Sequence, residues 1–216
     1  AVSGDRMTAN GPELLGNVFV IRRTKPTFTR QALSTPTLTS GIDMDLHRFQ
    51  ISADSAGSVG LMGFRFQVDM RGSFSVENWR LRRGATDVPL ADISITYMGP
   101  PSNFVTIVFA NEEIITGSGV GYTLHGTITG PVLAGDYISI RPYRDTHWTI
   151  SCIFGCGVGA DLALDSGHGT PIPVGLLWSD LSEAPHSYAE RALGGSVDWI
   201  GDFWVEDLTQ TSTLSR

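Results

Sequence analysis

The sequence has little lysine, little cysteine and no long apolar run. Lys25 is the only lysine, so arginine carries almost all of the positive charge, and the net charge is −7 with an isoelectric point of about 5.1. An acidic chain without a concentrated basic face is a poor nucleic-acid binder, and we expect no nucleic-acid partner. No stretch approaches the roughly 18 consecutive apolar residues of a transmembrane helix, so we expect no membrane span. The chain begins at Ala1, without Met and without an apolar signal segment, which fits a processed, exported protein as well as a shortened one.

The two cysteines, Cys152 and Cys156, lie close together in the segment CIFGC. The three-residue gap does not match the usual paired zinc knuckle, and no second Cys or His pair completes a metal site. We expect a local disulfide, which would stabilise the fold by about 2 kcal/mol and would indicate an oxidising compartment. Two buried free thiols are the alternative.

Turn-forming residues are abundant, with 25 Gly and 11 Pro, and they separate short apolar segments. The clearest segment is Met62–Met70, in which apolar and polar residues strictly alternate, as in a half-buried strand. Before it, Met44–Leu46 and Phe49–Ala53 are apolar in opposite phases. One extra residue swaps the faces of a strand, so the change predicts a bulge near His47–Arg48. Asp54–Gly57 supplies the turn between these two strands.

Further short strands recur through most of the chain, whereas a helix is suggested only weakly and only around residues 182–193. The pattern predicts an all-β fold, a β-sandwich of Greek-key or jelly-roll type with long loops and little helix. We expect an N-terminal arm over residues 1–41, formed by an extended strand and a Ser/Thr/Pro linker, and a single sandwich domain over residues 42–216. The further strands are expected at Trp79–Leu81, Ile93–Tyr97, Val105–Phe109, Tyr122–Ile128, Ile138–Ile140 and Ile150–Phe154.

Signals for catalysis are weak. Asp165-Ser166-Gly167 resembles the turn of aspartic proteases, but that chemistry needs two carboxylates sharing one proton, and there is no second such triplet. No histidine has metal-ligand spacing, and His125 is expected to be an ordinary histidine on the polar face of a strand. We therefore expect no enzymatic activity and no cofactor. A hydrolase is kept as the third hypothesis, after a structural subunit and a glycan-binding module. The carboxylates that would suit Ca²⁺, without matching a defined loop motif, are Asp43, Asp45, Asp198, Asp202, Glu206 and Asp207.

Aromatic residues are crowded into the C-terminal third of the chain. Trp178, Trp199 and Trp204 would stack on sugar rings if they formed an exposed row, as in carbohydrate-binding modules. Packing in the core explains the same residues. The sequence leaves both interpretations open.

Several segments together resemble a domain of uncharacterised, predicted surface proteins of candidate-phyla bacteria. The resemblance rests on Val20–Thr27, on Phe49–Gly57 leading into Phe64-Arg65-Phe66, on Leu177–Asp180 with Pro185-His186-Ser187, and on Asp198-Trp199 with Val205–Leu208. It covers most of the chain from about Val18 onward and implies export, a β-rich fold and a role at the cell surface. It carries over no catalytic residue, and Cys152–Cys156 departs from it. Because no long extension follows Arg216, the chain is expected to be a free-standing unit.

The leading hypothesis is a secreted structural subunit of an extracellular filament, pilus-like fibre or surface layer, with copies of itself as partners. The stretch from Leu14 to Thr29 is apolar and extended, and the flexible segment after it would let it complete the sheet of a neighbouring copy. The alternative to this exchange is pairing within its own domain. The second hypothesis is an extracellular module that binds surface glycans. The residues expected to carry the exchange are Leu15, Val18, Val20, Ile21 and Phe28.

Overall fold

The computed structural model describes residues 22–101, 103–143, 175–184, 186, 199–200, 205 and 210–216. These residues form strands and connections without a helix, so none of them forms a helix that could cross a membrane. The strands are β1 (Pro26–Gln31), β2 (Asp43–Ala53), β3 (Ser58–Arg71), β4 (Ser75–Arg83), β5 (Thr86–Asp87), β6 (Ile93–Met98), β7 (Phe104–Thr116), β8 (Val120–Thr129), β9 (Tyr137–Pro142), β10 (Leu176–Ser179), β11 (Trp199–Ile200) and β12 (Ser212–Ser215).

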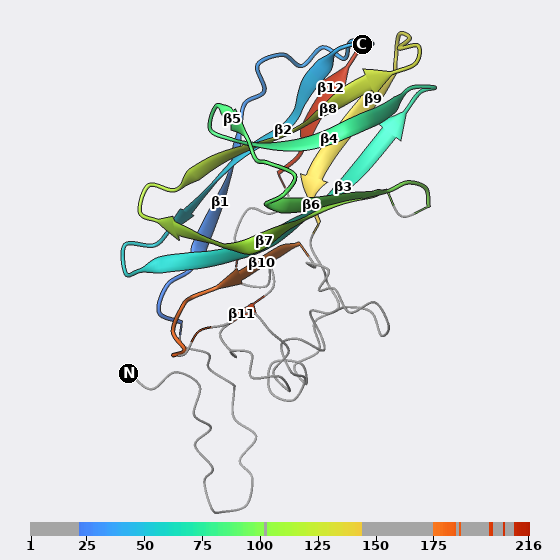
Figure 1. Ribbon diagram of the computed structural model, residues 1–216. Helices are drawn as coiled ribbons and strands as arrows, with labels where there is room; N and C mark the ends of the chain where they lie inside the picture. The colour runs from blue at the N-terminus through green and yellow to red at the C-terminus, as the bar shows by residue number, and fades with distance from the viewer. Residues whose placement is uncertain are drawn as a thin grey trace, which may run out of the picture.

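Two antiparallel sheets pack face to face (Figure 1). The five-stranded sheet has the order β1-β2-β8-β4-β5. The seven-stranded sheet has the order β11-β10-β3-β7-β6, and β9 joins it by pairing with β3 on one side and β12 on the other. The chain crosses between the sheets repeatedly, for example from β2 to β3, from β3 to β4 and from β7 to β8. The prediction of an all-β sandwich is confirmed.

Strand β3 contains the alternating segment that the sequence singled out. Phe64, Phe66 and Val68 are buried, whereas Arg65 is half-buried and Asp69 is exposed. Before Phe64 both faces of the strand are covered, and the register against β7 shifts between Leu61 and Gly63. The predicted half-buried strand is therefore confirmed from Phe64 onward.

Strand β2 contains the predicted bulge. Its register against β8 shifts between Asp45 and His47, which is where the apolar phase changes in the sequence. The extra residue lets Leu46 and Phe49 both face the core although they are three positions apart. After β2 the chain turns at Asp54, whose Oδ1 accepts a 2.7 Å hydrogen bond from the backbone N–H of Ala56.

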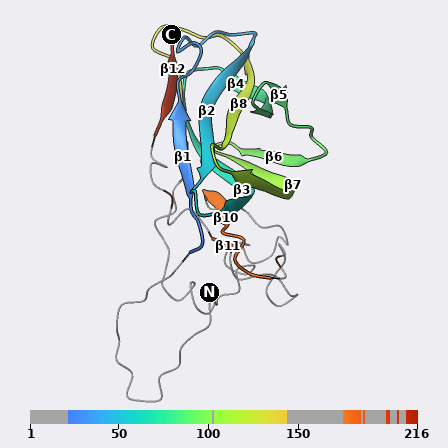
Figure 2. The same ribbon diagram turned by 90° about the vertical axis from the view of Figure 1, so that its left-hand side faces the viewer.

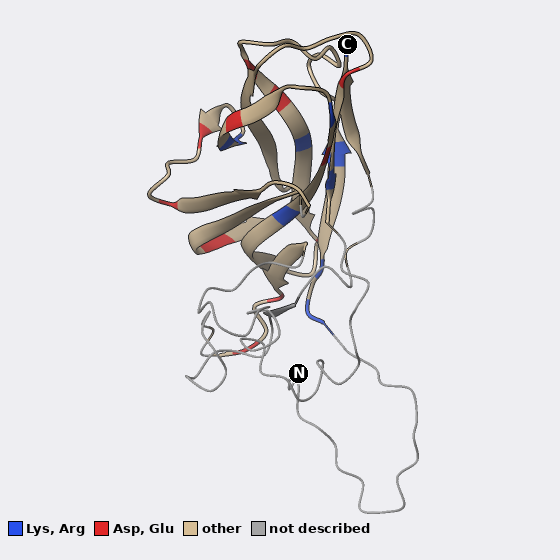
Figure 3. Cartoon of the chain, turned by 90° about the vertical axis from the view of Figure 1, so that its right-hand side faces the viewer, with Lys and Arg blue, Asp and Glu red and all other residues tan. Residues whose placement is uncertain are grey.

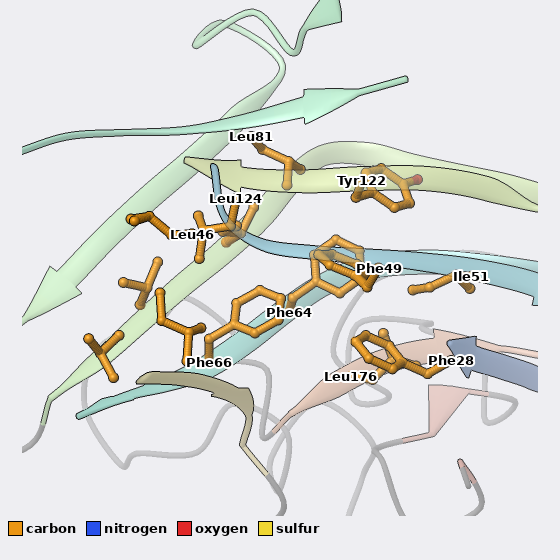
Figure 4. Close-up of a cluster of buried hydrophobic side chains, with 14 of the residues drawn as sticks. Phe28, Leu46, Phe49, Ile51, Phe64, Phe66, Leu81, Tyr122, Leu124 and Leu176 are labelled. Atoms are coloured by element: carbon orange, nitrogen blue, oxygen red, sulfur yellow. The ribbon is translucent and has the colours of Figure 1, made fainter. Parts of the chain in front are cut away.

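Aromatic rings from both sheets meet in the middle of the core (Figure 4). Phe49 of β2 lies at their centre and is fully buried. Its ring centroid is 5.0 Å from that of Phe28, 5.1 Å from that of Phe64 and 5.4 Å from that of Tyr122. Phe28 and Tyr122 come from the five-stranded sheet and Phe64 from the seven-stranded sheet. One ring therefore ties the two layers together.

The expected boundary at residue 41 does not separate two units within the described residues. β1 pairs along its whole length with β2, from Pro26 opposite Ala53 to Gln31 opposite Arg48. Leu38 is fully buried and belongs to the same core cluster. The reason is that apolar side chains of residues 26–38 complete the sandwich of the same chain. From residue 22 onward, the expected arm is part of the domain.

The turn between β7 and β8 offers a sharp test of backbone packing. Gly117 and Gly119 both have positive φ, at 52° and 84°. A Cβ at Gly119 would lie 2.2 Å from the carbonyl oxygen of Ile51 and 2.7 Å from Cα of Ser52, whereas a Cβ at Gly117 would meet nothing within 4 Å. The two positions therefore share the conformational penalty but differ in steric overlap.

We expect Gly117→Ala to lower the free energy of unfolding by about 1 kcal/mol, the usual cost of a left-handed conformation. We expect Gly119→Ala to lower it by about 3 kcal/mol, because displacing the backbone of β2 adds an overpacking cost. Urea unfolding of both variants measures the difference. Equal losses at the two positions would contradict the described approach of β2 to this turn.

Candidate functional site

A charged network on the outer face of the five-stranded sheet surrounds His125. The imidazole is fully buried, and it lies 2.9 Å from Oδ2 of Asp43 through Nδ1 and 3.1 Å from Oδ1 of Asp87 through Nε2. Arg80 bridges the same two carboxylates, at 2.8 Å from Asp43 and 3.2 Å from Asp87. Arg82 adds a 3.1 Å contact to Asp87. These groups join β2, β4, β5 and β8, so the network fastens four strands of one sheet.

The network also fixes the charge of Asp87. Burial raises the pKa of this carboxyl, but the hydrogen bond from Arg82 and the charges of His125, Arg82 and Arg80 outweigh burial and lower the pKa below its ordinary value. The carboxyl group of Asp87 is therefore ionised in the folded protein at neutral pH. A carboxylate held between two guanidinium groups suits an ion pair rather than a general base.

Asp43 and Asp45, two of the carboxylates that would suit Ca²⁺, contact cations of this network. Asp43 lies against Arg80, and Oδ1 of Asp45 is 3.7 Å from Nη1 of Arg82. In the part of the chain that the structure describes, no group of three or more His, Cys, Asp and Glu side chains has the arrangement of a metal site. The other expected carboxylates lie outside the described residues, namely Asp198, Asp202, Glu206 and Asp207, as does Asp165.

A second polar contact joins the 175–186 segment to β7. Nε2 of His186 lies 2.9 Å and 3.0 Å from the two carboxylate oxygens of Glu112. The carboxylate of Glu112 packs over Gly60 of β3, where a Cβ would overlap it. Gly60 thus leaves the space that the Glu112 carboxylate occupies, and the contact between Glu112 and His186 holds this segment against the seven-stranded sheet.

One lateral side of the sandwich, where β1 and β12 lie, is closed by local contacts (Figure 2). The carbonyl group of Lys25 accepts a hydrogen bond from Asp54 N–H, so the backbone of Lys25 faces the β2 side. Because the facing direction alternates along a strand, the backbone N–H and C=O positions of Pro26, Phe28 and Arg30 point away from β2. Pro26 has no N–H, and Arg30 N–H donates to Oε1 of Gln210 at 3.1 Å. These contacts blunt the β1 edge.

The edge of β12 is covered in a similar way. Leu38 N–H donates to Ser215 C=O at 3.0 Å, and Ser215 N–H donates to Pro36 C=O at 2.9 Å. Residues 36–38 therefore run along β12 and pair with it. Proline, side-chain capping and a covering segment are the devices by which proteins protect sheet edges from strand addition.

The opposite side of the sandwich carries an unprotected edge, strand β6. The carbonyl group of Asp92 accepts a hydrogen bond from Ala110 N–H, so the backbone of Asp92 faces the β7 side. Because the facing direction alternates along a strand, the N–H and C=O groups of Ile93, Ile95 and Tyr97 point away from β7. Across the described residues no hydrogen bond reaches these outward N–H and C=O groups. The strand reads ISITYM, without Pro or charge, and its register against β7 has no shift. The sequence predicted this strand but not its place at an edge, because the usual marks of an edge strand, Pro and charge, are missing from it.

Beside this edge, Trp79 of β4 and Tyr97 of β6 face each other between the two sheets. Their ring centroids are 5.5 Å apart and both residues pack against the core. Trp79 Nε1 and Tyr97 Oη are both shielded from water, and neither has a hydrogen-bond partner within the described structure. Burial raises the pKa of the Tyr97 hydroxyl, which therefore stays protonated. Two hydrogen-bond donors without a partner in the described structure thus lie near the free edge of β6.

Of the five residues expected to exchange between copies, Phe28 lies within the described residues and the other four do not. Phe28 lies in β1, where it is 1% exposed and its ring stacks on that of Phe49 in the same chain. Within the single chain β1 completes its own sheet, which is the alternative to exchange that the sequence left open, and exchange of Phe28 between copies stays a prediction. Four of the expected exchange residues, Leu15, Val18, Val20 and Ile21, lie outside the described residues, as do Cys152 and Cys156 with the expected disulfide.

Of the three tryptophans expected to stack on sugars, Trp178 is the one whose side chain lies within the described residues. Trp178 is 0% exposed and belongs to the core cluster, so its ring has no face free to stack on a sugar. Packing in the core is the interpretation that holds for this residue. Only the backbone of Trp199 is described, in β11, and Trp204 lies outside the described residues.

Charges of both signs are distributed over the described strands, as Figure 3 shows, and no single-sign face dominates. Comparisons with known proteins found no matching family model and no matching curated protein. Among solved structures, the chain is similar to the pilus backbone RrgB from Streptococcus pneumoniae, with 7% identity, a TM-score of 0.31 and coverage of 54% of this chain and 51% of that one. It is also similar to BcpA, the major pilin subunit of Bacillus cereus, with 7% identity, a TM-score of 0.28 and coverage of 54% and 35%. The chain thus spans about half of the first protein and about a third of the second, and likeness at this level carries no argument about function.

Proposed function

We propose that this chain is a structural subunit of an extracellular fibre, pilus-like filament or surface layer, built by β-strand exchange between copies. The observation that carries the proposal is the inequality of the sheet edges. The β1 edge is partly capped by Pro26 and Gln210, and the β12 edge is paired with residues 36–38. The outward backbone groups of β6, in contrast, have no partner among the described residues. An uncapped, uncharged edge strand is a template for another strand.

The donor strand comes from the residues before Arg22. Because β1 pairs along its whole length with β2, we assign the donor to the residues before it rather than to Phe28. Leu15, Val18, Val20 and Ile21 remain in the segment that precedes the described domain. Burying these four side chains would give roughly 6–12 kcal/mol before the costs of association and ordering. The backbone hydrogen bonds of an added strand would contribute to the contact beyond this burial.

A contact of this kind joins two different surfaces, a donor segment and an acceptor edge. Contacts between unlike surfaces give closed rings or open fibres, depending on whether the rotation between copies closes. The proposed function is therefore that of a polymer of this chain.

Deletion of residues 1–21 tests this function. We expect the full-length chain to form polymers that sediment and appear as fibres or sheets in negative-stain microscopy. The deletion should leave a folded monomer, because β1 and the described core begin after residue 21. A shorter deletion of residues 1–12, which leaves Leu15 to Ile21 in place, is the matched control and should still polymerise. A full-length chain that stays a monodisperse monomer at high concentration would refute the proposal.

A further inference from the structure

We propose that residues 14–21 of a second copy add to the free edge of β6, as a further strand of the seven-stranded sheet beside the Trp79–Tyr97 pair. This inference rests on the function proposed above and identifies the acceptor surface. The ladder between β6 and β7 runs without a shift from Ile93–Phe109 to Met98–Phe104. The outward groups of β6 therefore recur at every second residue, which is the spacing that an added strand needs.

The proposed donor segment has the composition of a strand. Residues 14–21 read LLGNVFVI, without charge and without proline. Val18 and Val20 share one face of an extended chain, and Phe19 and Ile21 share the other. When added to β6, one pair faces the side of Ile95 and Tyr97, which are half-buried, and the other lies beside the exposed side chains of Ser94 and Thr96.

The donor belongs to a second copy because donor and acceptor lie on opposite sides of the sandwich. The chain enters the domain at Arg23, whose backbone N–H donates to Oδ2 of Asp180 at 2.9 Å. It continues into β1, at the edge of the five-stranded sheet away from β5, whereas β6 lies on the other side (Figure 2). Each subunit thus offers a donor on one side and an acceptor on the other. Repetition of this contact runs head to tail and extends a fibre.

The added strand also accounts for the two unsatisfied donors. Trp79 Nε1 and Tyr97 Oη have no acceptor in the described structure, and a buried donor without a partner is unfavourable. The backbone carbonyl groups of a strand paired with β6 lie in the plane of the sheet, so an acceptor for these atoms must come from a side chain on the inward face of the added strand. Asn17, which shares a strand face with Phe19 and Ile21, supplies an amide oxygen. Trp79 and Tyr97 therefore favour an added strand that carries a hydrogen-bond acceptor over a strand that is purely apolar.

Photo-crosslinking in the full-length chain tests the acceptor. A photoreactive phenylalanine analogue replaces Thr96, and the matched control replaces Thr29, which is also an exposed threonine on a six-residue edge strand. Isotopically labelled and unlabelled copies are mixed before irradiation, so that mass spectrometry separates adducts between chains from adducts within one chain. We expect adducts from position 96 to residues 14–21 of another copy, and none from position 29.

The outcomes separate the acceptor from the function itself. Polymers that form without the adduct at position 96, or with the adduct at position 29, would overturn this inference and leave the proposed function standing. Adducts within one chain would show that the segment folds back, and they also overturn it. A chain that never polymerises refutes both proposals.

A pair of hydroxyl deletions tests the role of the unsatisfied donors. Tyr97→Phe removes the unpaired hydroxyl, and Tyr137→Phe removes a hydroxyl that donates to Oδ2 of Asp69 at 3.1 Å on another part of the sheet. We expect Tyr97→Phe to raise the concentration needed for polymerisation roughly threefold to tenfold, as for the loss of one hydrogen bond, and Tyr137→Phe to leave it unchanged. Equal behaviour of the two variants would overturn the part assigned to Tyr97.

Discussion

Replacement of Phe49 by alanine is expected to lower the free energy of unfolding by about 4 kcal/mol, the middle of the range for a fully buried phenylalanine. Phe49 is 0% exposed, and its ring contacts Phe28, Phe64, Phe66 and Tyr122 within 5.4 Å between centroids. The variant loses the transfer free energy of the ring and leaves a cavity. Because the walls of this cavity come from both sheets, they cannot collapse without shifting one layer against the other.

Urea unfolding followed by tryptophan fluorescence measures this loss. Leu90→Ala is the control, since Leu90 is 72% exposed and its truncation is expected to change stability by less than about 0.5 kcal/mol. A Phe49→Ala variant as stable as Leu90→Ala would mean that the two sheets do not meet at Phe49. Phe49→Leu, which keeps most of the volume, should lie between the two.

Features that depend on neighbouring residues were readable from the sequence. The period of two over Met62–Met70 identified β3, because successive side chains of a strand face opposite ways. The change of phase at His47 identified the bulge in β2, since one inserted residue swaps the faces. Both signals arise within a single strand and need no knowledge of its partner.

Features that depend on strand order were not readable. His125 was expected on a polar strand face, but its burial follows from Asp43 and Asp87, which lie 82 and 38 residues away in sequence. The arm was expected to be separate because residues 33–41 are rich in Ser, Thr and Pro. In the structure β1 pairs with β2, and residues 36–38 cover β12, so the same stretch closes one side of the sandwich. Whether β6 is an edge likewise depends on which strands the chain places beside it.

His47 makes the folded protein sensitive to acid. Its ring packs among aromatic rings, with centroids 5.6 Å from Phe49 and 5.3 Å from Phe66, and its Nδ1 lies 2.8 Å from Oγ of Ser212. Burial and, to a smaller extent, the charge of Arg30 together lower the pKa of His47 from 6.5 to about 3. The folded protein therefore holds this imidazole neutral at pH values where the unfolded chain protonates it.

The direction of the pH effect follows from this difference in bound protons. Between pH 6.5 and pH 3 the unfolded chain binds more protons at His47 than the folded chain does, so acid favours unfolding. The contribution of His47 to the free energy of unfolding is fully present above pH 6.5. Below pH 6.5 it falls by up to about 1.4 kcal/mol for each pH unit, and the loss levels off near pH 3. Urea unfolding at pH 7 and pH 5 should therefore show a loss of about 2 kcal/mol from His47 alone.

The variant His47→Gln isolates the contribution of the imidazole. Glutamine does not titrate and keeps a polar group near Ser212, and every other residue is the same in the two proteins. We expect the variant to be less stable than the wild type at pH 7, because the aromatic packing is lost, yet to lose less stability between pH 7 and pH 5. Parallel pH profiles for the two proteins would show that His47 accepts a proton in the folded state, which the apolar surroundings of its ring oppose.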